Sequence, residues 1–168
     1  SFTTGGIPHV PADATDVYRH TFPRMAAKTK QFYERYPIDI ERAAAVSDVL
    51  QSRKVTLPNG DPLTVERFQC LGSDFGMKPS FERVHWILDQ AFLDGDGSAS
   101  TSTELSDEFL SSVMNATSSR PLYWPLQEFI YANGELETPI RWAAQRVRDG
   151  KPEFGADERP LNFTGEAM

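Results

Sequence analysis

A run of helical periodicity near the N-terminus constrains the fold most. Between residues 13 and 36, large apolar side chains recur at steps of three, four and seven: Tyr18, Phe22, Met25, Phe32 and Tyr36. Asp13 or Thr15 can cap the start of this helix, and Pro37 ends it. Pro23 lies inside the run and removes one backbone hydrogen bond, so we expect a kink or a break there.

The rest of the chain is also predicted to be mainly helical. Apolar spacing and capping residues predict further helices over residues 39–52, 64–71, 80–92, 106–115 and 139–150, and a short helix that stops at Asn133 and Gly134. Two β-prone runs flank the turn signal at 58–61, which is compatible with one small hairpin or with a capped loop. The predicted fold class is a mainly α helical bundle with at most one short β-hairpin.

Size and charge limit the classes of partner. The 168 residues are 39% hydrophobic and 11% aromatic, which suits one globular domain. A net charge of −7 and a pI near 4.9 disfavour nucleic acid and anionic membranes as partners, and no apolar run is long enough to span a bilayer. The single cysteine, Cys70, cannot form an internal disulfide, so we expect a reducing, cytoplasmic setting.

Several stretches resemble metal-binding or catalytic motifs but lack residues that those motifs require. Residues 94–98 resemble the start of a calcium loop, but Ala99 and Leu105 stand where glycine and a bidentate acid are required. The three histidines lack metal-ligand spacing, and His85 is interpreted as a packed core residue. Residues 71–76 lack the spacing of a nucleophile elbow. We therefore expect no metal, no cofactor and no catalytic residue within this chain.

Two acidic residues are the candidates for ligand binding. On a helix, Trp124, Glu128 and Tyr131 would share a face, and a carboxylate between two aromatic rings suits a small cation that carries an apolar body. The alternative is an exposed Glu128 beside partly buried aromatics. Glu166 follows a glycine near the chain end. Two carboxylates facing one cavity would bind a protonated amine, whereas two unrelated surface acids would not.

A series of short motifs, in order along nearly the whole chain, resembles a known family. They are TGGIP at 4–8, DVYR at 16–19, FYERYP at 32–37, LPNGD at 57–61, LTVERFQ at 63–69, FERVH at 81–85, LSDEFL at 105–110, PLY at 121–123, RWAAQRV at 141–147 and FTGE at 163–166. In this series the chain resembles the cap, or lid, of the prolyl aminopeptidases (proline iminopeptidases) of the α/β-hydrolase superfamily.

The resemblance implies an organisation and a role. Residues 1–8 would leave the hydrolase sheet, 9–160 would form the helical cap, and 161–168 would return toward the sheet. The family removes N-terminal proline from peptides with a serine, aspartate and histidine triad that would lie outside this chain, so the fragment alone should be inactive. The cap's acids hold the substrate's free amine, a role that the resemblance assigns to Glu128 and Glu166, with Trp124 and Tyr131 near the proline ring. After Glu166 the sequence departs from the family pattern.

Two other interpretations stay open. The chain could be a stand-alone helical interaction module, which a start codon before Ser1 and a stop codon after Met168 would favour. It could also be the cap of another α/β-hydrolase, such as an esterase or an epoxide hydrolase. Paired acids facing one cavity would distinguish a prolyl aminopeptidase from these, because neutral substrates do not need them.

Overall fold

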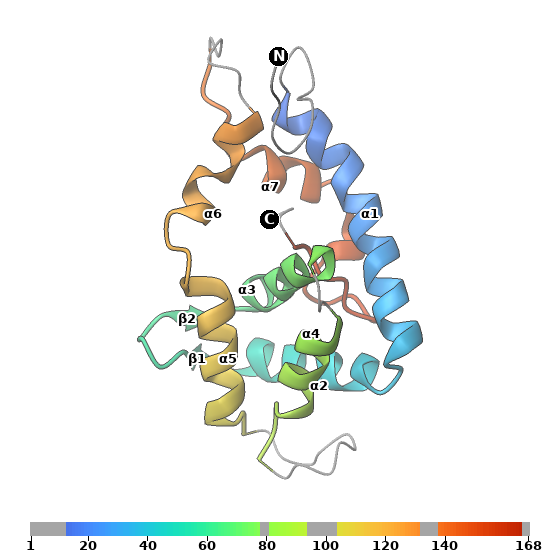
Figure 1. The fold of residues 1–168 in the computed structure, drawn as a ribbon, viewed down its shortest axis with the longest axis vertical. Coiled ribbons are helices and arrows are strands. Elements are labelled where there is room, and N and C mark those ends of the chain that lie inside the picture. Colours follow the sequence, from blue (N-terminus) through green and yellow to red (C-terminus); the bar gives the residue numbers. More distant parts are fainter. Residues whose placement is uncertain (1–12, 78–80, 94–103, 132–137, 166–168) are drawn as a thin grey trace.

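The computed structural model describes residues 13–77, 81–93, 104–131 and 138–165. Across these residues the chain is mainly helical, with one two-stranded antiparallel hairpin, which confirms the predicted fold class. In Figure 1, α1 (Ala14–Arg35) runs along one side of the molecule, with α6 and α7 at one end of it and α2 to α5 at the other. No helix among the described residues is both long and apolar enough to cross a membrane.

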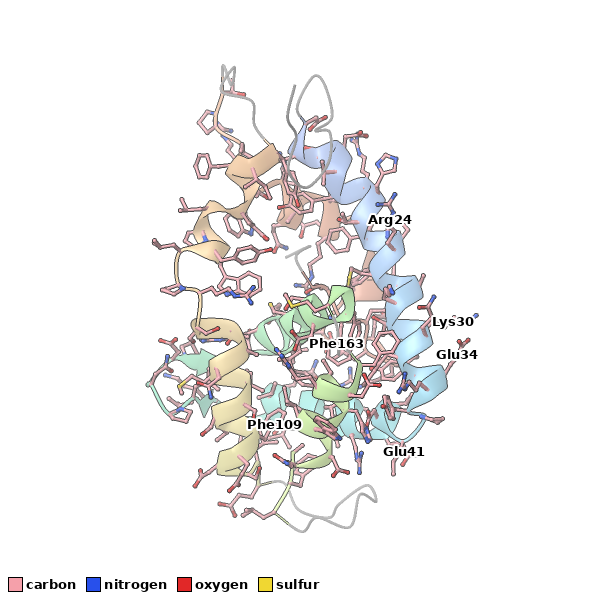
Figure 2. All side chains as sticks on the ribbon, in the orientation of Figure 1. Arg24, Lys30, Glu34, Glu41, Phe109 and Phe163 are labelled. Atoms are coloured by element: carbon pink, nitrogen blue, oxygen red, sulfur yellow. The ribbon has the colours of Figure 1, made fainter. Side chains whose placement is uncertain are left out.

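The long N-terminal helix forms where the periodicity predicted it. Asp13 caps α1 by accepting a hydrogen bond from the Thr15 amide at 2.8 Å. Its buried face includes Tyr18, Phe22 and Phe32, while Figure 2 shows Arg24, Lys30 and Glu34 on the outer side of the helix. The helix continues through Pro23 without a break.

The middle of the chain follows local signals closely. Helix α2 (Asp39–Ser52) leads into strands β1 (Val55–Thr56) and β2 (Pro62–Leu63), which pair Val55 with Leu63. Gly60 takes a left-handed φ of 88° in the connecting turn. Of the two predicted alternatives, the hairpin forms and the capped loop does not.

The three helices after the hairpin also begin at predicted caps or apolar runs. Thr64 caps α3 (Val65–Gln69), and the chain then tightens into the 3₁₀ helix η1 (Cys70–Gly76). Helix α4 spans Phe81–Asp89, and Ser106 caps α5 (Asp107–Ser118).

The C-terminal third departs from the predicted elements. The stretch around Glu128 is a single α-turn, α6 (Tyr123–Leu126), followed by the 3₁₀ helix η2 (Gln127–Tyr131). Helix α7 (Ala143–Arg148) begins four residues later than the predicted start at 139, because Arg141 and Trp142 adopt left-handed φ angles of 56° and 53°. A last 3₁₀ turn, η3, spans Pro152–Phe154.

Residues 161–165 pass through the centre of the domain. Phe163 is fully buried, and its ring packs against Phe32, Phe68 and Phe75 with centroid separations of 6.0, 5.6 and 5.4 Å. The backbone on either side of Phe163 is also hydrogen-bonded. The Tyr33 hydroxyl donates to the Leu161 carbonyl, and the Thr164 amide donates to the Gln69 carbonyl. The central position of Phe163 is visible in Figure 2.

Candidate functional site

Glu128 is buried at the start of α7. Its side chain is on η2, the residue is 2% exposed, and its two carboxylate oxygens accept hydrogen bonds from the Ala143 amide at 3.0 Å and the Ala144 amide at 2.9 Å. These amides belong to the first turn of α7, whose N–H groups have no partner within the helix. The interpretation of Glu128 as an exposed acid is wrong: it is a buried cap supplied from a distant part of the chain.

A cavity of about 490 Å³ borders Glu128. Its lining is Pro125, Glu128, Phe129, Thr138, Pro139, Ile140, Arg141 and Trp142. Most of this lining is apolar, and among the described lining residues Glu128 is the acid and Arg141 is the base. A carboxylate oxygen can accept more than one hydrogen bond, so the two amide bonds leave acceptor capacity for a ligand donor.

The structure does not bring Trp124 or Tyr131 to this cavity. The Trp124 indole donates from Nε1 to the Thr117 carbonyl at 2.7 Å, and the Tyr131 ring packs edge-on against Tyr18 with centroids 5.7 Å apart. One helical face does not form because the backbone changes from α to 3₁₀ geometry at Gln127, which alters the rotation per residue.

Glu166 lies outside the described residues, so its approach to Glu128 stays a prediction. The residues just before Glu166 pack closely against η1. A Cβ added at Gly72 would meet the Phe163 Cβ at 2.7 Å, and Gly165 has a left-handed φ of 58°. The two glycines let the segment that leads to Glu166 pass tightly over η1.

Two aromatic residues at the Glu128 cavity, Phe129 and Trp142, were not among the predicted site residues. The Phe129 side chain is mostly exposed, whereas Trp142 is held beside the cavity by the backbone before α7. Trp142 borders both this cavity and a neighbouring one of about 670 Å³. Thr138 and Pro139 formed a standard helix-start signal, which placed Trp142 inside a predicted helix. No residue type in the sequence indicates two consecutive left-handed residues here, because neither Arg141 nor Trp142 is a glycine or an asparagine.

The neighbouring 670 Å³ cavity is lined by a cysteine that is not activated as a nucleophile. Cys70 lines it, but burial raises the pKa of this thiol to about 12, so it stays protonated at neutral pH. Arg67 and Arg148 also line it, and both are engaged: Arg67 donates to Thr117, and Arg148 donates to the buried Gln69.

A third cavity, of about 510 Å³, borders the buried Asp74. Desolvation raises the pKa of Asp74 above its ordinary value, while Arg83 and Arg120 act in the opposite direction. Arg83 lies 3.4 Å from Oδ1, and Oδ2 has no hydrogen-bond partner among the residues that the structure describes.

His85 forms a hydrogen-bond contact with an aspartate that resembles part of a catalytic triad. Its Nδ1 lies 2.8 Å from Asp39 Oδ2, and its ring stacks on Tyr36 with centroids 4.0 Å apart. The second Asp39 oxygen accepts a hydrogen bond from Arg42 at 3.0 Å. The carboxylate therefore links α2 to α4, and His85 is packed, as the sequence predicted.

Metal-ligating side chains do not cluster in the part of the chain that the structure describes. Within those residues there is no group of three or more histidine, cysteine, aspartate or glutamate side chains that could hold a metal ion.

Comparison with known proteins gives the family relationship. No protein-family model matches the chain. It is 34% identical over 170 aligned positions to a proline iminopeptidase from Aeromonas sobria, and 29% identical over 169 positions to proline iminopeptidase aneH from Aspergillus aculeatus. Each alignment covers 99% of the chain. The chain is homologous to one part of the proline iminopeptidases. It spans 37% and 36% of the length of these two relatives, so most of each proline iminopeptidase has no counterpart here.

Proposed function

We propose that the chain is the helical cap of a prolyl aminopeptidase, a serine peptidase of the α/β-hydrolase type that removes N-terminal proline from peptides. The support is the similarity to proline iminopeptidases over 99% of the chain and little more than a third of the relatives. In this proposal residues 1–8 leave the hydrolase sheet, 9–160 form the cap and 161–168 return. The hydrolase core of the longer protein is then the cap's partner and carries the triad.

The observation that carries the proposal is the buried Glu128 carboxylate beside a mostly apolar cavity. Its orientation is set in advance by the Ala143 and Ala144 amides. A protonated α-amine would bind its remaining acceptor positions through charge-assisted hydrogen bonds, which are strong where water is excluded. Pro125, Ile140 and Trp142 would supply apolar walls for the ring that carries the amine.

Glu166 completes the amine site in this proposal. Two carboxylates on one amine would fix the substrate so that its first peptide bond lies against the serine of the hydrolase core. A blocked N-terminus has neither the charge nor the donors, so it would not bind. Tyr131 lies outside the cavity and packs against the apolar cluster that contains Ala143 and Ala144.

The test is release of arylamine from proline arylamide. The longer protein should cleave this substrate but not its N-acetyl form, because acetylation removes the positive charge. Purified 1–168 should cleave neither. Turnover by the isolated chain would show that it contains its own catalytic residues, which the proposal denies.

Glu166→Gln in the longer protein tests the amine site. The loss of one charged hydrogen bond worth about 3 kcal/mol predicts a fall in kcat/KM of about a hundredfold. Glu158→Gln, at an exposed glutamate, is the matched control and should leave the rate unchanged. An unchanged rate for Glu166→Gln would remove this residue from the site.

A further inference from the structure

Arg141 and Trp142 form a strained step immediately before α7. Both have left-handed backbone angles, and neither is a glycine or an asparagine. In this conformation the Cβ atom crowds the following carbonyl, so each such residue is unfavourable by itself. Strain of this kind persists only where surrounding contacts hold it.

The contacts that hold it are an acid on one side and a base on the other. Glu128 accepts hydrogen bonds from the Ala143 and Ala144 amides, which follow the strained step. Arg146 donates from Nη1 to the Ile140 carbonyl at 2.7 Å and to the Arg141 carbonyl at 2.6 Å. We call Glu128 and Arg146 the clamp.

The clamp forms hydrogen bonds with backbone groups that a longer α7 would need for its own helical hydrogen bonds. If α7 began at residue 139, the Ala143 amide would donate to the Pro139 carbonyl and the Ala144 amide to the Ile140 carbonyl. Glu128 occupies both amides, and Arg146 occupies the Ile140 carbonyl. The regular helix that the sequence favours is therefore replaced by the strained step.

The strained step places Trp142 between two cavities. The residue is 39% exposed and borders both the cavity of Glu128 and the neighbouring cavity that contains Cys70 and Trp124. An indole is a large, rigid and mostly apolar surface. The Trp142 indole borders the same cavity as the Glu128 carboxylate, and this combination suits a ligand whose amine is part of, or attached to, a compact apolar ring.

We propose that Trp142 is the wall that selects the ring of the N-terminal residue, and that Glu128 and Arg146 are positioning residues for this wall. The inference rests on the proposed function and adds a specificity-determining residue to it. In this role Glu128 acts twice, by binding the amine and by holding the indole. Arg146 acts only through the wall, because it does not line the Glu128 cavity.

The experiment compares kcat/KM for prolyl and alanyl arylamides in the longer protein. Both substrates carry a free amine, but only proline has a ring for the wall to contact. Trp142→Ala should lower the proline-to-alanine ratio about tenfold, the range expected for losing a few methylene contacts in an apolar pocket. Trp142→Phe should keep most of the preference. A purely structural role would lower both rates together and leave the ratio unchanged.

Arg146→Gln tests the clamp without removing charge or atoms from the cavity. It should shift the ratio in the same direction by about threefold, mainly through KM for the prolyl substrate, because the indole then loses its fixed position. Arg159→Gln is the matched control, since Arg159 also donates to two backbone carbonyls, those of Ala156 and Glu158. It should leave the ratio unchanged. Circular dichroism melts of each variant check folding.

The outcomes separate the two proposals. Absence of turnover of either substrate by the unmutated longer protein overturns the proposed function and this inference with it. Turnover with a ratio that Trp142→Ala leaves unchanged overturns the wall alone. An equal shift in Arg146→Gln and Arg159→Gln, or no shift in Arg146→Gln, overturns the clamp.

Discussion

The two ends of this domain are stabilised in different ways. Around Phe163, stability comes from closely packed aromatic rings contributed by α1, α3, η1 and the 161–165 segment. Around Glu128, a few polar contacts hold a strained backbone step, and the same end exposes large apolar side chains: Leu122, Leu126, Phe129 and Ile130. The ring cluster is therefore held by apolar packing, whereas the backbone conformation at the Glu128 end depends on a few polar contacts.

The largest expected effect is at the ring cluster. Phe163→Ala should destabilise the protein by about 3–5 kcal/mol, since it removes a fully buried ring and leaves a cavity among rings that cannot all collapse into it. Urea unfolding measures the change. Phe129→Ala is the matched control, because that ring is 61% exposed, and it should cost far less. Equal losses would mean that the two ends do not differ as described.

The next effect is at the Glu128 end. Glu128→Ala should destabilise the protein by about 2–3 kcal/mol, because it leaves the Ala143 and Ala144 amides without acceptors in a buried place. Glu128→Gln should recover only part of this loss, since one amide oxygen replaces two carboxylate oxygens. Urea unfolding of both variants gives the order. Full recovery by glutamine would show that a single acceptor is enough.

A smaller effect of opposite sign is expected within the strained step. Arg141→Gly should stabilise the protein by about 1 kcal/mol, because glycine adopts a left-handed φ without the Cβ clash. Arg53→Gly, at an extended position, is the control and should not stabilise. A loss of stability in Arg141→Gly would show that the step carries little strain.

The smallest effect is a change in pH dependence. Burial raises the pKa of Asp74, so the native state binds its proton more tightly than the unfolded chain does. That contribution is complete below the ordinary aspartate pKa and is lost as the pH rises through the raised value. Asp74→Asn should therefore gain stability relative to the parent between pH 3 and pH 7, as urea midpoints would show.

Asp61 provides the control with the opposite sign. Hydrogen bonds from Asn59 and Arg67 lower the pKa of Asp61, so its contribution is present at neutral pH and is lost as the pH falls. Asp61→Asn should lose stability relative to the parent over the same interval. Parallel changes in the two variants would contradict the assignment of burial as the cause at Asp74.

Sequence reasoning succeeded where the controlling contacts are local. The caps at Asp13, one of two predicted alternatives, and at Thr64 act within three residues, as does Ser106 at the predicted start of its helix. The turn at Gly60 joins two short adjacent strands. The apolar face of α1 was also readable, because burial on one side of a helix imposes a period that survives in the sequence.

The sequence also indicated Glu128, but not its hydrogen-bond partners or the aromatic residues that line its cavity. The carboxylate accepts hydrogen bonds from residues fifteen and sixteen positions away, and Trp142 joins it at one cavity only because α7 begins late. Trp124 and Tyr131 were assigned to the same face on the assumption of one regular helix, which the change to 3₁₀ geometry removes.

By itself, the sequence determined the helical class, the turn between β1 and β2 and the starts of α1 to α5, since each depends on residues a few positions apart. Only the tertiary structure decided that Glu128 is a buried cap, that Arg141 and Trp142 are left-handed, and that Phe163 joins rings from α1, α3 and η1. The physical reason is that segments far apart in the sequence compete in these places. They compete for the same buried hydrogen-bond partners and for the same apolar space in the core. Local propensity is too weak to settle such a competition.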